Sequence, residues 1–254
     1  MPLQVVTVPC LSDNFAFLAH DPASGATAVI DVPEAAPVLA ALAERGWRAS
    51  DVLLTHHHGD HVQGLAALQE GLAAPARVTG AAADAHRLPP LDRAVAPGDT
   101  VAIGEETGTV IDVSGHTVGH IACHFPGARV AFTGDSLMAL GCGRVFEGSL
   151  AMMWESLRRI DALPADTRIC SGHDYLDGNL VFARSVEPDN AEAAARVERA
   201  RDEGPEAVHV TLATERATNP FLRAPLPHIK GALGRSDMSD ADAFAELRRR
   251  KDAF

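Results

Sequence analysis

Apolar runs separated by turn residues divide the first half of the chain into short strands and helices. Runs bounded by Pro, Gly, Asp and Asn are typical of strands, whereas apolar residues spaced three and four apart indicate helices. The helix that opens at Pro33 is expected to end at Gly46, because glycine commonly terminates helices. The pattern predicts strands at residues 3–8, 15–19, 26–30, 51–54 and 77–79, and helices at 33–45, 62–72 and 81–87.

The pattern changes near residue 173. Before that point strands and helices alternate, with strands at 107–114, 129–133 and 167–170 and a helix at 150–163. Beyond it the predicted elements are helices at 179–186, 189–201 and 239–251, and Asp189 and Ser239 are plausible N-caps. We therefore expect an α/β fold of two sheets with outer helices over residues 1–173, and a smaller helical domain over residues 174–254.

The composition suits a globular protein with a substantial core. The chain has 254 residues, of which 46% are hydrophobic, enough for one large or two modest domains. No apolar run reaches the length of about 18 residues needed to span a membrane, and the start lacks a signal-peptide pattern, so we expect a cytoplasmic protein. The formal charge of −12 argues against nucleic acid as a partner. Four scattered cysteines are expected to be small core residues: Cys10, Cys123, Cys142 and Cys170.

The densest polar stretch, Thr55 to His61, lies between a predicted strand and a predicted helix. Its candidate metal ligands are His56, His58, Asp60 and His61. Alternate side chains of an extended run point to opposite sides, so His56 and His58 would share one ion and His57 would point away. The last two ligands follow the turn that Gly59 permits and can reach a second ion. Imidazoles and carboxylates lose free energy when buried without partners, and a cation supplies that partner.

Three more candidate ligands follow the ends of later strands: His116, Asp135 and His173. A carboxylate has two oxygens, so Asp135 is the best candidate to bridge two ions. The expected division gives His56, His58 and His116 to one ion and Asp60, His61 and His173 to the other, with Asp135 between them.

Other polar residues near the predicted strand ends are given structural roles. His120 and His124 lie in or beside a strand, where a packing histidine is favoured, and His86 is expected on the surface. Asp31 ends a strand and could cap a helix or support the metal ligands; the structural role is favoured.

Nitrogen-rich ligation of this kind suits zinc, iron or manganese, and we expect two divalent ions, with zinc preferred. Two such ions lower the pKa of a shared water and polarise a carbonyl held against them, so the predicted reaction class is hydrolysis. Asp135 would act as the bridge, and Asp60 could also orient the hydroxide or take its proton. No Ser-His-Asp or Cys-His pairing stands out as a competing catalytic group.

The ligand motif resembles the metallo-β-lactamase superfamily, which implies a four-layer αβ/βα sandwich. The superfamily includes hydrolases, nucleases, lactonases and oxidoreductases, so this likeness selects no substrate. Segments of the second half look like the hydroxyacylglutathione hydrolase (glyoxalase II) family: residues 141–148, 172–175, 179–188, 219–223 and 248–254. This second resemblance implies cleavage of the thioester of S-D-lactoylglutathione, and of related 2-hydroxyacylglutathiones, to glutathione and the acid. That reaction is the second step of methylglyoxal detoxification.

The same resemblance places substrate-binding residues around glutathione: Arg144, Phe146, Tyr175, Arg248 and Lys251. Glutathione has two carboxylates, which cations and a phenol can hold by charge-assisted hydrogen bonds. Phe146 departs from the family pattern, which usually has tyrosine there, and the lost hydroxyl is expected to cost about 0.5–1.5 kcal/mol of binding. A small-molecule thioester is the expected partner, with no nucleic acid, no membrane and a monomeric chain.

Two other functions fit part of the sequence. A glutathione persulfide dioxygenase with one iron resembles the first domain, but such enzymes usually lack the helical second domain and use fewer ligands. Asp60, His61 and His173 therefore count against it. A non-catalytic metal-binding or nucleic-acid-processing relative is opposed by the full ligand set and by the acidic charge.

Overall fold

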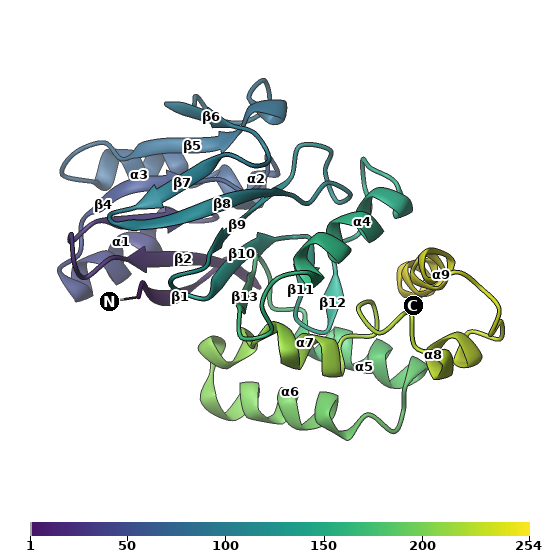
Figure 1. Cartoon of the computed structure of the whole chain (residues 1–254). Coiled ribbons are helices and arrows are strands. Elements are labelled where there is room, and N and C mark those ends of the chain that lie inside the picture. The colour runs from purple at the N-terminus through teal and green to yellow at the C-terminus, as the bar shows by residue number, and fades with distance from the viewer. Residues whose placement is uncertain (1) are drawn as a thin grey trace.

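Two β-sheets stack face to face and carry helices on their outer faces (Figure 1). The computed structural model describes residues 2–254, so Met1, the first residue of the predicted first domain, lies outside the described range. The first sheet contains, in spatial order, β1 (Gln4–Cys10), β2 (Asn14–His20), β3 (Thr27–Ile30), β4 (Ala49–Leu53), β5 (Arg77–Ala81) and β6 (Arg93–Val95). Its first three strands are antiparallel, and the later strands pair in parallel.

The second sheet contains, in spatial order, β13 (Arg168–Ser171), β10 (Val130–Gly134), β9 (Ile121–Phe125), β8 (Glu106–Asp112) and β7 (Thr100–Ile103). β10 and β13 are parallel, and the other neighbours are antiparallel. Parallel pairing brings the carboxyl ends of β10 and β13 to one edge of the sheet, so the residues that follow both strands come close together. Phe17 of the first sheet meets Phe132 of the second in the core between them, with ring centroids 5.5 Å apart.

Helices cover both outer faces of the sandwich. α1 (Ala35–Arg45) and α3 (Leu65–Gly71) pack on the first sheet, and α4 (Leu150–Asp161) packs on the second. α1 ends where the sequence predicts, at Gly46, whose φ of 65° lies in the left-handed region that suits glycine. The layers follow the order helix, sheet, sheet, helix, which confirms the expected αβ/βα sandwich.

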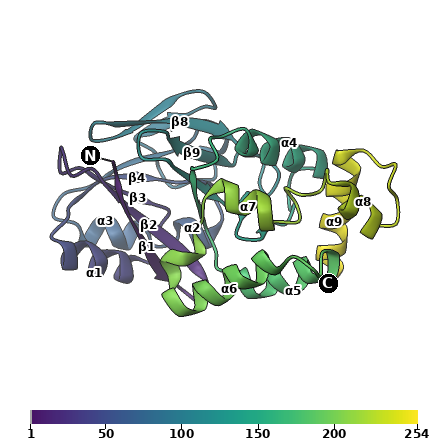
Figure 2. The same cartoon turned by 60° about the horizontal axis from the view of Figure 1, so that its bottom comes forward.

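The regular elements of the described chain beyond β13 are all helices, and Figure 2 shows most of them on the side of the molecule away from α1 and α3. They are α5 (Leu176–Val186), α6 (Ala191–Glu203), the 3-10 turn η2 (Pro205–Val208), α7 (Leu212–Thr218), α8 (Pro227–Ala232) and α9 (Asp240–Ala253). Ser239 caps α9 as predicted, with its hydroxyl accepting a hydrogen bond from the backbone of Asp242. The prediction for α6 is wrong by one residue, because the side chain of Asn190 makes the cap and Asp189 does not.

The segment after the His-rich stretch differs from its predicted single helix at residues 62–72. It forms two short helices, α2 (Gly59–Val62) and α3, separated at Gly64. Gly64 lies against the backbone of Val32, whose carbonyl oxygen would be 2.9 Å from a Cβ at this position. Close packing against the segment that joins β3 to α1 therefore breaks the helix, and α2 begins within the ligand motif itself.

Other short elements either differ from their predicted form or have no counterpart among the predicted elements. The hairpin of β11 (Leu137–Met138) and β12 (Gly141–Cys142) has strands of two residues each. The predicted helix at 81–87 shrinks to the 3-10 turn η1 (Ala82–Asp84). A run this short carries too few positions to distinguish one period from another.

Two expectations from composition can be compared directly with the structure. All four cysteines are buried and free, as expected for small core residues. Within residues 2–254, no helix has both the length and the apolar character that crossing a membrane requires.

Candidate metal centre

The candidate ligands gather at one end of the sandwich, because each follows the carboxyl end of a strand. The His-rich stretch follows β4, His116 lies in the loop after β8, Asp135 follows β10, and His173 follows β13. Strand ends that are far apart in the sequence thus bring their side chains to one place. All seven predicted ligands lie within this cluster.

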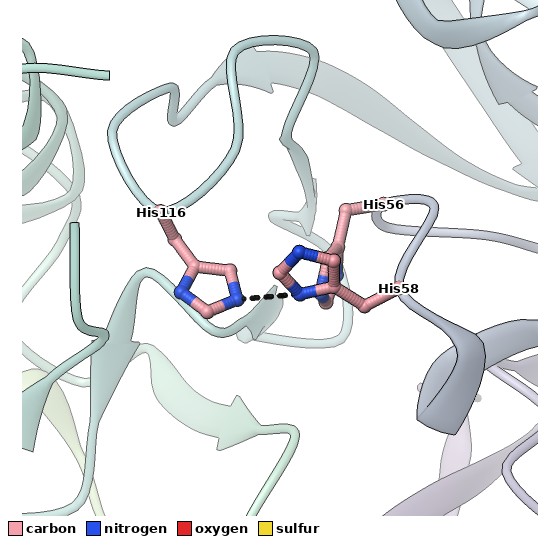
Figure 3. A group of neighbouring side chains, drawn as sticks. All are labelled: His56, His58 and His116. Carbon is pink, nitrogen blue, oxygen red and sulfur yellow. Dashed lines mark hydrogen bonds between the residues drawn. The ribbon is translucent and has the colours of Figure 1, made fainter. Parts of the chain in front are cut away.

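His56, His58 and His116 form the first group of ligand atoms, which all lie within 4.8 Å of one another. Figure 3 shows His116 approaching from one side and the other two from the facing loop. Nε2 of His116 lies 2.9 Å from Nδ1 of His58. Ring nitrogens that point at one another over this distance can share a proton or a cation.

Asp60, His61 and His173 form the second group, again within 4.8 Å. Nε2 of His61 lies 3.3 Å from Nε2 of His173, and Oδ2 of Asp60 lies 3.3 Å from the same atom of His173. These two groups match the division of ligands that the sequence spacing suggested, but a further group of neighbouring atoms, Asp31, His56 and His61, crosses it, so the division stays a prediction.

Asp135 lies between the two groups. Its Oδ2 is 3.4 Å from Nε2 of His116 and 3.3 Å from Nε2 of His173, so one oxygen faces both groups. Its Oδ1 is 3.4 Å from Nε2 of His61. Gly172 leaves room for this arrangement, because a Cβ there would come within 2.5 Å of Oδ1. The carboxylate therefore stands where a bridging ligand would stand.

Unpaired buried atoms provide a test of whether a metal fits. Among the described residues, Nε2 of His56 and Oδ1 of Asp135 are buried and make no hydrogen bond. Burying such atoms without a partner costs free energy. A cation bound by the His56 nitrogen and the Asp135 oxygen would recover that free energy. The donor set of five imidazoles and two carboxylates fits divalent metal ions.

The other ring nitrogen of each of four candidate ligands is also held in place. His61 Nδ1 lies 2.8 Å from Asp31 Oδ2, and His173 Nδ1 lies 2.9 Å from Asp13 Oδ1. The corresponding contacts of the other two are His116 Nδ1 to the Arg144 carbonyl at 2.7 Å and His56 Nδ1 to the Thr55 hydroxyl at 3.0 Å. A proton on Nδ1 donates to these partners and leaves Nε2 free to bind metal, so the partners select the binding tautomer.

Asp31 takes the supporting role rather than the structural one that the sequence favoured. It does not cap α1, whose N-cap is Glu34. It sits in the left-handed region at φ 55° and accepts hydrogen bonds from both the backbone and the hydroxyl of Thr55, each at 2.8 Å. This backbone turns its carboxylate toward His61.

Sequence reasoning missed Asp13 and Asn14, which lie where the turn after β1 enters β2. Asn14 is buried, and its side-chain amide donates to Oδ2 of Asp60 at 3.1 Å. A backbone bridge from Asn14 to His173 places this turn beside the end of β13. The available signal was an acid and an amide beside a strand end. The ring that Asp13 contacts, His173, lies 160 residues further along the chain, so a local pattern does not reveal the contact.

The remaining histidines lie outside the two groups. His57 points away, with Nδ1 3.0 Å from Asp84 and Nε2 3.3 Å from Glu147. His86 is exposed and His124 is buried in β9. His120 does more than fill space: its ring stacks on His56 with centroids 4.6 Å apart, and its Nε2 accepts the backbone N–H of Asp135 at 3.0 Å.

The electrostatic environment of the cluster has two parts. Burial, which removes water from a charged ring, lowers the pKa of three of the rings: His56, His58 and His116. Burial opposes the charge on His61 too, but the carboxylates of Asp135 and Asp31 outweigh it and hold the pKa of His61 well above its usual value. For His173, hydrogen bonds to Asp135 and Asp60 overcome burial and raise the pKa to about 10. Negative charge that favours protons here would also favour a cation.

A cavity of about 690 Å³ connects this cluster to a group of cationic and aromatic side chains. All five residues predicted to bind substrate line it: Arg144, Phe146, Tyr175, Arg248 and Lys251. Tyr175 stacks on His173 with ring centroids 4.8 Å apart, and Phe146 meets His116 edge-on at 5.2 Å. Burial raises the pKa of Tyr175 to about 12, so its hydroxyl stays protonated and can donate a hydrogen bond.

The fold and the ligand cluster place the chain in the metallo-β-lactamase superfamily, whose model matches residues 21–173. Solved structures of similar fold include the BLEG-1 B3 metallo-β-lactamase, with a TM-score of 0.67 and 20% identity over 86% of this chain and 99% of that one. The chain of TTHA1623 in a di-iron-bound form has a TM-score of 0.61 and 25% identity, with 86% of this chain and 99% of that chain covered.

Residues 174–254 narrow the assignment, because they match the model described as the hydroxyacylglutathione hydrolase C-terminus. A hydroxyacylglutathione hydrolase of Cereibacter sphaeroides (strain ATCC 17025) is 64% identical over the full length of both chains. Another, of a Jannaschia species, is 56% identical over 99% of this chain and 98% of its own. The chain belongs to the hydroxyacylglutathione hydrolase family.

Proposed function

We propose that this protein hydrolyses the thioester bond of S-D-lactoylglutathione to give glutathione and D-lactate. The observation that carries the proposal is the single cavity that joins the ligand cluster to the cationic side chains. A thioester carbonyl can lie against the cluster while the carboxylates of the glutathione part lie at the other end. Membership of the hydroxyacylglutathione hydrolase family supports the same substrate class.

The end of the cavity lined by the five predicted substrate-binding residues, here called the recognition end, suits an anion. Arg144, Arg248 and Lys251 bring three positive charges to the cavity wall, in a chain whose formal charge is −12. A local basic group is what an anionic ligand needs on an acidic protein. We propose that these side chains and Tyr175 hold the substrate carboxylates by charge-assisted hydrogen bonds.

We propose that two divalent ions occupy the ligand cluster, with zinc preferred. One would be held by His56, His58 and His116, the other by Asp60, His61 and His173, and both by Asp135. When bound, such ions activate a shared water and polarise the substrate carbonyl. The similar TTHA1623 chain has a di-iron-bound form, so iron is the first alternative, and manganese is the second.

Asn14 and Asp60 are placed to orient the water that attacks the thioester carbonyl. Asn14 donates to Oδ2 of Asp60 and so fixes a carboxylate that also lines the cavity. A carboxylate held in this way can orient a water molecule and accept its proton, which is the role we propose for Asp60 in addition to ligation. We further propose that residues 1–173 act as the catalytic domain and residues 174–254 as the substrate-binding domain of a monomeric cytoplasmic enzyme.

Release of free thiol from S-D-lactoylglutathione by the purified, metal-loaded protein tests the proposal directly. S-D-lactoyl-N-acetylcysteamine has the same thioester but no carboxylates, so its kcat/KM is expected to be at least about tenfold lower, as for the loss of a charged hydrogen bond. Absence of thiol release from the glutathione substrate would refute the function. Oxygen consumption with glutathione persulfide, with one iron per chain, would favour the dioxygenase instead.

A further inference from the structure

One carboxylate behind the cavity wall connects two of the proposed substrate-binding arginines. Asp252 lies in the last turn of α9, and Arg248 precedes it by one helical turn, whereas Arg144 comes from the loop after β12. Asp252 itself does not line the cavity, although both arginines do. The acid therefore contacts both arginines from outside the cavity lining.

The contacts involve specific edges of the two guanidinium groups. Oδ1 of Asp252 accepts hydrogen bonds from Nε and Nη2 of Arg248 at 3.2 Å and 2.8 Å, and from Nε of Arg144 at 3.3 Å. The remaining terminal nitrogen of Arg248, Nη1, donates to the Cys142 carbonyl at 2.9 Å. Arg144 contacts Asp252 through Nε alone, so its two terminal nitrogens remain available to a ligand.

The Arg248–Cys142 contact already joins α9 to the segment that carries Arg144, and Asp252 adds a link to the Arg144 side chain itself. The Arg144 side chain is 55% exposed, and an exposed arginine has many rotamers to lose when it binds a ligand. Arg248, in contrast, is buried and held on two sides. A shared carboxylate fixes the exposed arginine relative to the buried one before the ligand arrives, which lowers the cost of binding.

We propose that Asp252 is a positioning residue, which aligns Arg144 with Arg248 so that together they receive a carboxylate of the glutathione part of the substrate. The proposal rests on the proposed function. Asp252 makes no contact with the reacting atoms, and its effect passes through the arginines. It should therefore change KM and leave kcat nearly unaltered.

Asp252 could also weaken substrate binding through its negative charge, an effect on KM opposite in sign to that of positioning. With Arg144, Arg248 and Lys251 nearby, Asp252 lowers the local positive charge, so its removal would strengthen the general attraction of an anion. A single exposed charge changes affinity only by a few fold, by about the amount of a surface ion pair. Misplacement of a binding clamp costs more, up to about a hundredfold. Positioning should therefore dominate.

The test compares Asp252→Asn with wild type in steady-state hydrolysis of S-D-lactoylglutathione. We expect KM to rise about tenfold and kcat to stay within about twofold, because substrate positioning is weakened and the metal centre is untouched. Asp252→Glu should restore part of the loss. The matched control is Glu246→Gln, which removes an acid of the same helix that pairs with Arg250 and lies outside the cavity lining. Its KM should equal that of wild type.

A substrate without carboxylates separates positioning from general damage. For the diethyl ester of S-D-lactoylglutathione, wild type and Asp252→Asn should have equal KM, because the arginines then have no anion to receive. An unchanged or lower KM for the acid substrate in Asp252→Asn would overturn the proposal. An equal loss with the diester would do so as well, since it would reveal a merely structural role.

Binding of glutathione, measured by calorimetry on the same proteins, keeps the two proposals distinguishable. If wild type binds glutathione but releases no thiol from the thioester, the proposed hydrolysis fails while the role of Asp252 is still decided by the dissociation constants. A weaker affinity in Asp252→Asn, by about the same tenfold factor, supports positioning. Equal affinity contradicts it.

Discussion

The two ends of the cavity are built in different ways. At the metal end, the side chains follow strand ends of two packed sheets, and His56, His61 and Asp135 are buried. At the recognition end, the residues come from a loop and from helices, and Phe146 and Tyr175 are exposed. The metal end is fixed by the core of the fold, and the recognition end, apart from the buried Arg248, lies on the surface.

The two ends also differ in how their contacts are supported. Four of the imidazoles have a second partner on the ring nitrogen that faces away from the cluster. The recognition side chains are held mainly by ion pairs and by a few backbone carbonyls, such as that of Gly178 for Lys251 at 3.0 Å. Changes at the metal end should therefore remove the chemistry, whereas changes at the recognition end should adjust the preference for substrate.

The largest effect is expected from Asp135→Asn. An amide has no charge and is a poor bridging ligand, so kcat/KM should fall about a thousandfold, which corresponds to about 4 kcal/mol. The fold should persist, because the two side chains have nearly the same shape. Metal content per chain by elemental analysis, kcat/KM with S-D-lactoylglutathione and near-ultraviolet circular dichroism measure the three quantities.

His57→Ala is the matched control for this substitution. His57 lies in the same motif but contacts Asp84 and Glu147 instead of the cluster, so its loss should leave the metal content largely intact. Near-normal turnover by Asp135→Asn would contradict the bridging role. Loss of metal from His57→Ala would contradict the geometric division between ligands and neighbours.

A smaller effect is expected from Asp31→Asn, which acts on the metal end through His61. Asparagine tolerates the left-handed backbone of this position, and its one carbonyl oxygen can still accept the Thr55 backbone N–H. Its amide nitrogen cannot accept from the Thr55 hydroxyl or from His61, so the change removes both the negative charge and the acceptor beside His61. Loss of such a supporting carboxylate typically costs about 10- to 100-fold in metal affinity. Titration with a chelator, followed by metal analysis, measures the change.

Asp51→Asn tests whether any buried carboxylate of the first sheet has this effect. Asp51 lies in β4 and pairs with Arg77 at 2.6 Å, away from the cluster. Its loss should lower thermal stability without altering metal affinity. If both variants retain metal equally well, Asp31 does not support the ligands.

The clustering of the candidate ligands could be predicted from the sequence, but the residues that contact them from behind could not. His56, His116 and Asp135 each follow a strand end, and residue type together with that local position is enough to identify them. Asp13 and Asn14 also follow a strand, yet a turn between two antiparallel strands commonly contains such residues. Their role appears only when the fold brings β13 beside them.

For the fold too, features that depend on contacts between distant segments could not be predicted from the sequence. The alternation of strands and helices indicates two sheets with outer helices, and this expectation is confirmed. Gly64 interrupts a helix because of the Val32 backbone beside it, and the hairpin before Arg144 has strands too short to show a period. Packing between distant segments decides these features, and a local pattern does not contain it.

The smallest effect is expected at the exposed recognition end, from Phe146→Tyr. The ring of Phe146 lies edge-on to His116 and His58 and has a guanidinium carbon of Arg144 6.0 Å from its centroid. A phenol here would add one donor at the cavity wall without moving the ring, since the side chain is 61% exposed and has space for the hydroxyl. One hydrogen bond of about 0.5–1.5 kcal/mol should lower KM about 2- to 12-fold and leave kcat unchanged.

Tyr175→Phe provides the opposite change on the other wall of the same cavity, and its KM should rise by a similar factor. Both rings contact candidate ligands, since Tyr175 stacks on His173 and Phe146 meets His116 edge-on, so a change in kcat in either variant would reveal coupling between the two ends of the cavity. If Phe146→Tyr alters the metal content or lowers kcat severalfold, the recognition end is not separable from the metal end. Equal metal content and a change confined to KM would instead show that binding can be adjusted at this wall while the strand-end ligands stay as they are.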